Sequence, residues 1–381
     1  MPITLNGTTG INGPLGSAAA PSYGDTTTTN TGLYFPTATT AAIATNGTLA
    51  LSIDTSQNIT VSGTVNMASS FLRNKIINGN MAVDQRNAAA SQTFTAAGAL
   101  AYTVDRWYGY CTGANVTGQQ VTGATANQYR YQFTGAASVT AIGFGQRIEA
   151  LNCADLAGTT ATLSAVLSNS LLTTVTWTAY YANTTNTFGS LASPTVTSIA
   201  TGTFTVTATA ATYSANITVP AAATTGIQIL FTVGAQISGT WVIGNVQLEP
   251  GSVATPFERP LYSKQLADCQ RYYQMSYDIG TALGTATTTG LFMIGFAISG
   301  QNNGAGSIPF KVSMRTAPTI SYWDGAGNAS KLTNGAPTPS TNNVAPVSAP
   351  TMIATNWFVH PGQNTTGTTY NWLHYAASAE L

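Results

Sequence analysis

Charged side chains are scarce in this sequence. Asp, Glu, Lys and Arg make up only 6% of its 381 residues and the formal net charge is zero, whereas about 25% of an ordinary soluble domain is charged. Hydrophobic residues still account for 44%, so the polar remainder is mostly Thr, Asn, Ser, Gln and Gly. This composition favours β-structure. Two interpretations of the weakly charged surface stay open: a solvated Thr/Asn surface, or one largely covered by contacts between subunits.

Basic clusters and long apolar runs are also missing. No segment gathers Lys and Arg, so we predict no nucleic-acid partner. The longest apolar run, 291–298, contains a glycine and is far shorter than the roughly 20 residues of a membrane helix. We therefore predict no membrane insertion. The first residues contain no basic segment followed by an apolar one, so we expect no secretory signal peptide.

Residues with metal-binding or redox chemistry are few and isolated. The three cysteines, Cys111, Cys153 and Cys269, form no Cys-x-x-Cys pair, so we expect reduced, buried side chains rather than a zinc site or redox motif. His360 and His374 have no metal-ligating companion at a suitable spacing. The sequence predicts no metal and no cofactor.

Acidic pairs of the kind that glycosidases use are not evident either. Such enzymes hold two carboxylates about 5–9.5 Å apart. No spacing marks Asp84, Asp105 or Glu149 as a catalytic pair. We expect these acids to form structural ion pairs with Arg86, Arg106 or Arg147, and we predict that the protein is not an enzyme.

Residues 1–70 form a first region with no Lys, Arg or His. Short apolar stretches at 32–36, 49–53 and 59–61 are separated by turn signals such as Asn46-Gly47, which predicts short strands. The apolar content is too small for a private core, so we expect neighbouring chains to supply contacts. A disordered tail is the alternative.

Residues 71–260 show the alternation of half-buried strands, at 171–177, 204–208 and 227–233. Many short strands at regular spacing predict an antiparallel jelly-roll sandwich. Half of all charged residues lie in 73–106 and 249–271. We expect these two segments to lie together and to form specific pairs.

Residues 261–381 begin with a helical pattern. Apolar residues spaced 4, 3 and 4 apart predict one linking helix from 264 to about 274, with Ser263 as its N-cap. Strand-like stretches follow at 290–299, 310–314, 319–323, 352–359 and 370–375, whereas 327–350 should be loop. The predicted architecture is therefore mainly β: an N-terminal assembly segment, a central sandwich, one helix and a small C-terminal β domain.

Three segments resemble a family of bacteriophage tail-fibre and tail-associated proteins. The first is Asn74-Lys-Ile-Ile-Asn-Gly-Asn-Met-Ala-Val-Asp-Gln-Arg86 with Tyr102-Thr-Val-Asp-Arg-Trp-Tyr108. The second is Val246-Gln-Leu-Glu-Pro-Gly-Ser-Val-Ala-Thr-Pro-Phe-Glu-Arg259, leading into Cys269-Gln-Arg-Tyr-Tyr273. The third, weaker one combines 310–319 with 376–381. Residues 31–36 and 51–59 are similar to fibre stalk segments.

This resemblance implies a carbohydrate-binding-module-like jelly roll on a trimeric virion appendage that is assembled in the host cytoplasm. Residues 1–70 would attach to other phage tail or head proteins, and the C-terminal domain would face a host cell-surface glycan. Two alternatives stay open: a head fibre, decoration or tail spacer protein without a receptor role, and a polysaccharide-degrading tailspike. The family offers no catalytic residues to carry over.

Two sets of residues are singled out for function or structure. Aromatic rings and polar side chains of the C-terminal region could bind sugar, although rings at strand spacing more often fill a core; the candidates are Tyr322, Trp323, Asp324, Trp357 and Trp372. The segments that carry the resemblance also fit a purely structural role. There we expect an ion pair within Asp105-Arg106-Trp107 to pin a strand end, and a stiff turn at Glu258-Arg259.

Overall fold

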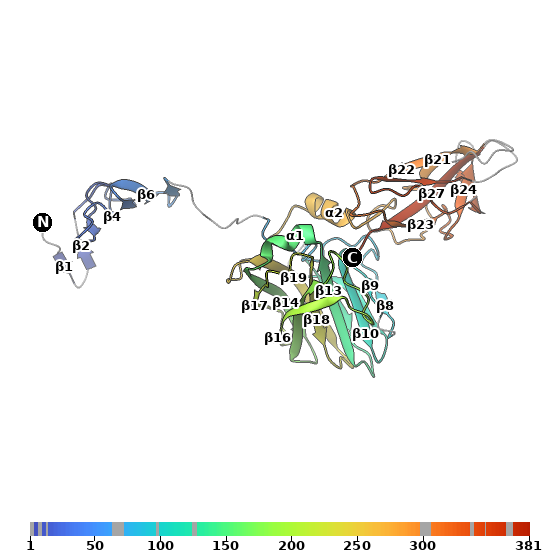
Figure 1. Ribbon diagram of the computed structural model, residues 1–381, viewed down its shortest axis with the longest axis horizontal. Helices are drawn as coiled ribbons and strands as arrows, with labels where there is room; N and C mark the ends of the chain where they lie inside the picture. Colours follow the sequence, from blue (N-terminus) through green and yellow to red (C-terminus); the bar gives the residue numbers. More distant parts are fainter. Residues whose placement is uncertain are drawn as a thin grey trace. The chain divides into compact units, whose positions relative to one another are not determined.

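The chain forms two compact units, Met1–Ser70 and Phe71–Leu381, which are described separately (Figure 1). The computed structural model describes residues 4–6, 10–12, 14–62, 72–96, 99–123, 128–297, 306–335, 339–346, 348–362 and 369–381. Both units are mainly β with antiparallel pairing, which confirms the predicted fold class. Within the described residues, no helix is long and apolar enough to span a membrane.

A sandwich of two six-stranded sheets forms the centre of the second unit. The first sheet has the order β16-β15-β18-β13-β10-β9, and its strands span Val196–Thr205, Thr174–Ala182, Ile227–Val233, Ala141–Ile148, Trp107–Thr112 and Ala101–Tyr102. The second sheet has the order β17-β14-β19-β12-β11-β8, and its strands span Ala211–Thr218, Thr160–Asn169, Thr240–Pro250, Tyr129–Thr134, Val116–Thr122 and Gln92–Phe94.

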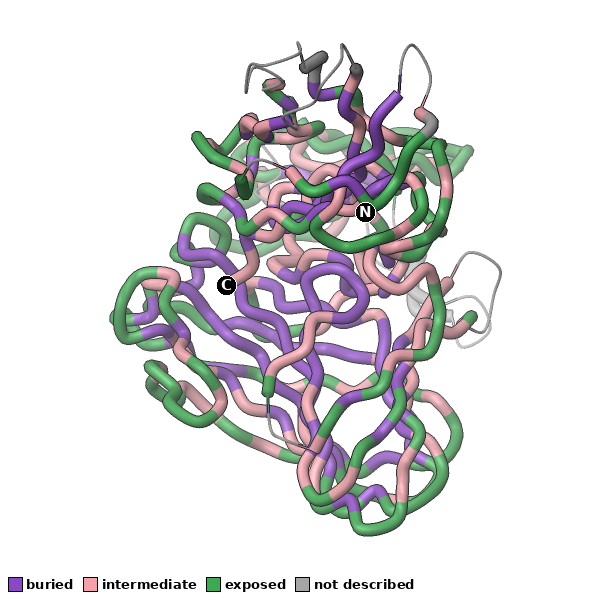
Figure 2. Tube along the Cα trace, turned by 90° about the vertical axis from the view of Figure 1, so that its right-hand side faces the viewer, coloured by how far each residue is buried: buried purple, intermediate pink, exposed green. Residues whose placement is uncertain are grey.

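Alternating side chains from both sheets fill the space between them. Trp107 stacks on Phe144 at 4.8 Å between ring centroids, and Phe133 stacks on Trp241 at 5.4 Å. Buried positions run along the strands, whereas many connecting loops are exposed (Figure 2). The three cysteines are buried and free, as predicted. The period-2 pattern in the sequence thus reflects one face packed in this core and one face turned outward.

The linking helix is shorter than predicted. Helix α2 spans Tyr262–Gln270, and the residue that precedes it, Leu261, provides no side-chain cap. Ser263 therefore lies inside the helix, and its prediction as N-cap is wrong. The helix ends early because the chain becomes strand β20 (Tyr273–Met275), which pairs with β27 (Thr369–Ser378). A further short helix, α1 (Ala150–Cys153), was not predicted.

Strand β27 organises the C-terminal domain, because it pairs with β20, β21, β23 and β24. The remaining strands are β21 (Phe292–Ala297), β22 (Gly306–Pro309), β23 (Thr319–Trp323), β24 (Leu332–Gly335), β25 (Pro339–Val344) and β26 (Trp357–His360).

Several strand predictions for this domain need correction. The loop predicted for 327–350 contains β24 and β25, which form because β27 supplies a hydrogen-bonded neighbour. The stretch 310–314 is not a strand, and only the end of 352–359 is one. The last two residues of the strand predicted at 290–299 lie outside the described residues.

The two charged segments of the second unit lie together, as predicted. Arg73 forms an ion pair with Glu249 at 3.3 Å, and the Glu258 carboxylate accepts a hydrogen bond from the Asn74 backbone N–H at 3.0 Å. Glu149 pairs with Arg271 at 2.9 Å, which ties the sandwich to the residue after α2. These contacts close the sandwich where the chain enters and leaves it.

The first unit contains a five-stranded antiparallel sheet in sequential order, from β3 to β7. Its strands are β3 (Tyr23–Gly24), β4 (Gly32–Tyr34), β5 (Ala41–Thr45), β6 (Thr48–Ile53) and β7 (Ile59–Val61); a separate pair joins β1 (Thr4–Asn6) to β2 (Gly10–Asn12). The strands predicted around 32–36, 49–53 and 59–61 are confirmed. Asn46 and Gly47 both have positive φ, 52° and 72°, between β5 and β6, as a tight hairpin turn requires.

Candidate functional site

The outer face of the first sandwich sheet carries an aromatic ring that lies over a glycine of the neighbouring strand. Tyr110 projects outward from β10, because its neighbour Cys111 belongs to the core. Its cross-strand partner on β13 is Gly143. A Cβ at Gly143 would lie 2.1 Å from Cε1 of Tyr110. Only glycine leaves room for the ring there, so the Tyr110 ring rests against the backbone of the neighbouring strand.

A shallow groove lies beside this ring on the same face. Gly143 pairs with Thr232 on β18, and Thr232 pairs with Thr176 on β15, so these residues continue the row that begins at Tyr110. The groove has a volume of about 540 Å³ and contains no charged side chain; it is lined by Ala141, Leu172, Thr173, Thr174, Thr176, Thr232, Val233 and Gly234. It therefore presents hydroxyl groups and apolar surface next to an aromatic ring.

The other end of this sheet face is covered. Tyr102 Oη donates to the Leu381 carbonyl oxygen at 2.7 Å, and Arg147 Nη1 donates to the same oxygen at 2.8 Å. The buried Tyr108 lies against both Tyr102 and Arg147. The C-terminal residues thus occupy the Tyr108 end of the face and leave the Tyr110 end open.

Chemically, the groove suits a neutral ligand with both hydroxyl groups and apolar faces. Burial raises the pKa of Tyr110, and the nearby Tyr180 hydroxyl raises it further, so Tyr110 keeps its proton and can donate a hydrogen bond. Ligand sites commonly combine apolar walls with a few placed polar groups. An aromatic ring, threonine hydroxyls and the absence of ionised side chains in the groove match a sugar ring, which has apolar C–H faces and hydroxyl groups around its edge.

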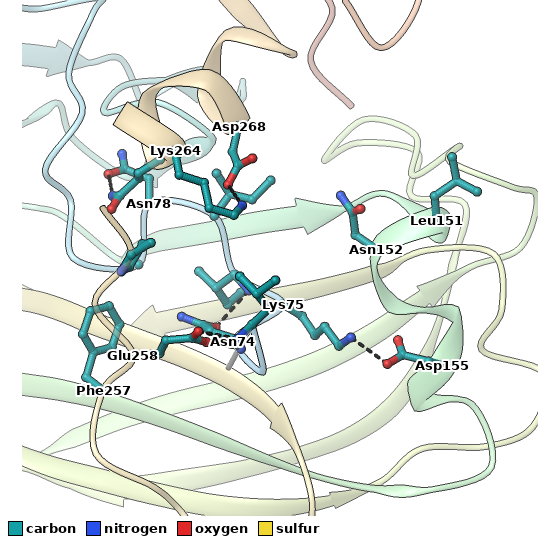
Figure 3. A pocket seen from close by; sticks show the side chains of 16 residues that line it. Asn74, Lys75, Asn78, Leu151, Asn152, Asp155, Phe257, Glu258, Lys264 and Asp268 are labelled. Carbon is teal, nitrogen blue, oxygen red and sulfur yellow. Dashed lines mark hydrogen bonds and ion pairs between the residues drawn. The ribbon is translucent and has the colours of Figure 1, made fainter. Parts of the chain in front are cut away.

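A second hollow of about 490 Å³ lies between residues 72–79, α1 and α2 (Figure 3). Four of its five charged groups form two ion pairs: Lys75 Nζ lies 2.6 Å from Asp155, and Lys264 Nζ lies 2.6 Å from Asp268. The fifth, Glu258, accepts a hydrogen bond from the Asn74 backbone N–H. Gln265 donates to Asn78 Oδ1 at 2.7 Å. Because these polar groups already bind each other, the hollow is first of all a structural junction between the sandwich and α2.

Two of the five aromatic and polar candidates are buried. Tyr322 lies edge-on to His360 with ring centroids 4.5 Å apart. The Asp324 carboxylate accepts hydrogen bonds from the backbone N–H groups of Ala326 and Asn328, at 2.9 and 2.8 Å. Both side chains therefore shape the interior and the turn after β23.

The three tryptophan candidates are half-buried on different strands. Trp323 on β23 packs edge-on to Tyr277 at 6.3 Å, Trp357 lies on β26, and Trp372 lies on β27. Strands β22 and β26 form their own two-stranded sheet. The structure does not bring the five candidates into one exposed surface, and sugar binding by the tryptophans stays a prediction.

The scaffold residues make contacts other than the expected ones. Asp105 is buried and accepts a hydrogen bond from the Gln85 backbone N–H at 2.8 Å; burial raises its pKa to about 7. Arg106 pairs with Glu380, and its guanidinium lies 3.5 Å over the Tyr272 ring. The expected ion pair within Asp105-Arg106-Trp107 is therefore wrong, because Arg106 reaches into the C-terminal domain instead.

The ion pairs expected for the three acids are not among those that the structure describes, although burial, which raises the pKa of both Asp84 and Asp105, is partly opposed by the positive charge of Arg86, which lowers it. The Asp84 carboxylate accepts from the backbone N–H groups of Asn87 and Ala89, and Glu149 pairs with Arg271. Arg86 and Arg106 both bind Glu380. Of the two residues in the second motif, Glu258 binds the Asn74 backbone as described above, and Arg259 is exposed in the irregular segment before α2, where the structure has no turn.

The histidines are buried and held by the fold. His374 stacks on Tyr277 at 3.8 Å, and its Nε2 lies 3.0 Å from the Thr287 carbonyl oxygen. Burial lowers the pKa of His360 to about 4. Across the described part of the chain, no group of three or more His, Cys, Asp or Glu is placed to hold a metal ion.

Sequence reasoning did not single out Tyr110 or Gly143. A signal exists in Gly143-Phe144-Gly145, where two glycines occupy outward positions of an otherwise alternating strand. Glycines at that spacing often mark a close approach by another group. The ring that approaches lies on another strand, so periodicity alone could not identify it.

No family model matches this chain, and no curated protein matches it either. Among solved structures, this chain is similar to the one described as "CBM4 structure and function". The match has 18% identity and a TM-score of 0.28, and it covers 46% of this chain and 98% of that chain. TmCBM61 in complex with beta-1,4-galactotriose matches at 11% identity over 47% of this chain and 99% of that chain, with a TM-score of 0.30. Bacteriophage CBA120 tailspike protein 4 matches at 18% identity over 47% of this chain and 21% of that chain, with a TM-score of 0.30.

Proposed function

We propose that this protein is a non-enzymatic adhesion subunit that binds neutral glycans through the groove beside Tyr110. The observation that carries the proposal is the Tyr110 ring lying over Gly143, next to a groove lined by threonine hydroxyls without ionised side chains. A sugar would stack its C–H face on the ring and exchange hydrogen bonds with Thr176 and Thr232. Such contacts are individually weak, because hydroxyl groups leave equally good partners in water.

Weak sites become useful when several copies act together, since linked sites bind with much greater avidity than one alone. We propose that the chain is a homotrimeric appendage of a phage particle, anchored to other tail or head proteins through residues 1–70. The motifs at 74–86, 102–108 and 246–259 support this placement by their resemblance to phage fibre proteins. The groove would then meet glycans on the host surface in several copies.

A non-catalytic role is supported by the state of the three acids that were considered as a catalytic pair, Asp84, Asp105 and Glu149. Asp84 and Glu149 are engaged by backbone N–H groups and by Arg271, respectively. Asp105 is buried and accepts a hydrogen bond from the Gln85 side-chain amide at 3.3 Å. None of the three lines the groove.

The test is glycan binding by the full chain, first on an array of bacterial surface polysaccharides and then by calorimetry on the best ligand. Tyr110→Ala should abolish measurable binding. The double variant Thr176→Val/Thr232→Val keeps the side-chain shape but removes two hydroxyls, and it should weaken binding at least about tenfold, which is 1.4 kcal/mol.

The matched control is Thr212→Val/Thr218→Val, which changes two exposed threonines of β17 in the opposite sheet. Its affinity should equal that of the parent protein. Binding that survives Tyr110→Ala would place the site elsewhere. Absence of binding to any glycan would favour a structural virion component, and release of new reducing ends would favour a polysaccharide-degrading enzyme.

A further inference from the structure

A row of apolar side chains crosses all five strands of the sheet in the first unit. The cross-strand partners are Tyr23 with Leu33, Leu33 with Ile43, Ile43 with Leu51, and Leu51 with Val61. Directly paired residues point to the same face of a sheet. The five side chains therefore form one continuous line from β3 to β7, which we call the apolar row.

A second apolar pair lies on the same face, beside the apolar row. Ile53 on β6 pairs with Ile59 on β7, and each lies two residues from a member of the row, so it shares that face. Ile53 and Ile59 are 39% and 64% exposed, and Ile43 of the row is 43% exposed. Branched apolar side chains thus cover one face of the sheet and meet solvent.

The opposite face already holds the small core of this unit. Its buried residues are Tyr34, Ala42 and Ala44, with Ala18 and Leu49 packed against them. Three buried residues, two of them alanine, provide little apolar burial for a five-stranded sheet. The sheet needs a second apolar layer, and the apolar row is the surface left to receive it.

The face also lacks charge. The charged side chains of residues 14–62 are Asp25 and Asp54, and each is held in its own turn. Asp25 accepts from the Thr27 backbone N–H at 2.6 Å, and Asp54 from those of Ser56 and Asn58 at 2.8 and 2.9 Å. A partner that relied on charge would find no complement on the apolar row, whereas an identical neutral face would meet no repulsion.

We propose that the apolar row is the surface through which copies of this chain associate. The partner that buries the apolar row must be available to every chain as it folds, in a number equal to the number of sheets. Another copy of the same chain meets that requirement. Closed homo-oligomers use such repeated surfaces. The inference rests on the proposed homo-oligomeric appendage and names the face that assembles it.

The first experiment measures the mass of the full chain by sedimentation equilibrium. The parent protein should sediment as a multiple of 39.3 kDa, and Ile43→Thr/Val61→Thr, which keeps β-branched residues in both strands, should sediment at the single-chain mass. The matched control is Leu151→Thr/Val253→Thr. These two residues are 83% and 72% exposed in the second unit, and this control should keep the parent mass.

The second experiment tests proximity in the assembled protein. Ile43→Cys should be joined to another copy by a short bismaleimide, whereas Thr60→Cys, on the opposite face of β7, should not. The native cysteines are buried and will not compete. A single-chain parent protein, an unchanged mass for Ile43→Thr/Val61→Thr, or equal cross-linking of both cysteine variants would overturn the proposal.

The two proposals fail in different ways. If Ile43→Thr/Val61→Thr loses assembly but each groove keeps its glycan affinity, the proposed glycan site is still supported. If Tyr110→Ala loses glycan binding but keeps the oligomer intact, the proposed role of the apolar row in assembly is still supported.

Discussion

Arg106 and Glu380 form a buried ion pair between residues 274 positions apart in the chain. Their side chains are 1% and 5% exposed. The pair joins the sandwich to the C-terminal domain, and Arg86 binds the other oxygen of the same carboxylate at 2.8 Å. One acidic side chain thus holds two guanidinium groups at the junction.

We predict that Glu380→Gln destabilises the second unit by about 3–5 kcal/mol, because removing one partner leaves a buried charge uncompensated. Urea unfolding of the full chain would measure this loss. The control is Asp268→Asn, which breaks the exposed pair with Lys264 and should cost at most about 0.5 kcal/mol. Equal losses for the two variants would refute the structural role assigned to Glu380.

Gly143→Ala should remove glycan binding while the sandwich stays folded. The added methyl group would collide with the Tyr110 ring and push it off the sheet. Calorimetric titration with the best ligand would report the loss. The control is Thr212→Val/Thr218→Val on the opposite sheet, which should keep the parent affinity; equal affinity of the two variants would show that the ring position is irrelevant.

Asp105 should give stability a specific pH dependence. Burial raises its pKa from 3.8 to about 7 in the folded protein, so the folded state binds more protons than the unfolded state between about pH 4 and pH 7. The contribution of Asp105 to the free energy of unfolding therefore falls as the pH rises through this window.

The variant Asp105→Asn retains an oxygen that can accept from the Gln85 N–H but cannot ionise. We expect it to gain stability relative to the parent protein as the pH is raised from 5 to 8. Urea unfolding at the two pH values measures the difference. A constant difference between variant and parent would contradict the raised pKa.

Asn78 should be one of the most sensitive polar residues. Its Nδ2 donates to the Val83 and Asp105 carbonyl oxygens at 2.8 and 3.0 Å, and its Oδ1 accepts from the Val83 N–H at 3.0 Å. Asn78→Ala would leave these buried groups unsatisfied and should cost about 2–4 kcal/mol in thermal or urea unfolding, since each costs about 1–3 kcal/mol. The control Asn183→Ala removes an exposed amide whose oxygen accepts from Thr197, and it should change stability by less than about 1 kcal/mol.

The alternation of apolar and polar residues predicts where strands occur better than it predicts the residues at which they begin and end. The stretch 227–233 coincides with β18, where every second residue, from Ile227 to Val233, packs in the core between the sheets. The strand predicted from 171 begins only at Thr174, because the Asn169 side chain binds the backbone N–H groups of Leu171 and Leu172 in a turn. Hydrogen bonds of this kind compete with the sheet and are not visible as periodicity.

Contacts between distant residues were beyond sequence reasoning. The motif around Arg106 was recognised, but its partner Glu380 lies in a different domain and no pattern connects them. The ring–glycine contact of Tyr110 depends likewise on strand register, which alternation does not fix in a chain with outward glycines. The candidate site therefore emerged from geometry, whereas the fold class emerged from composition.

The groove beside Tyr110 should bind its ligand with an affinity that does not depend on the salt concentration. Dissolved ions weaken attraction between charges by screening them, and no ionised side chain lines this surface. A ligand held by ring stacking and hydroxyl groups would stay bound alike in fresh water and in brine. Attachment of this kind would thus be indifferent to salinity.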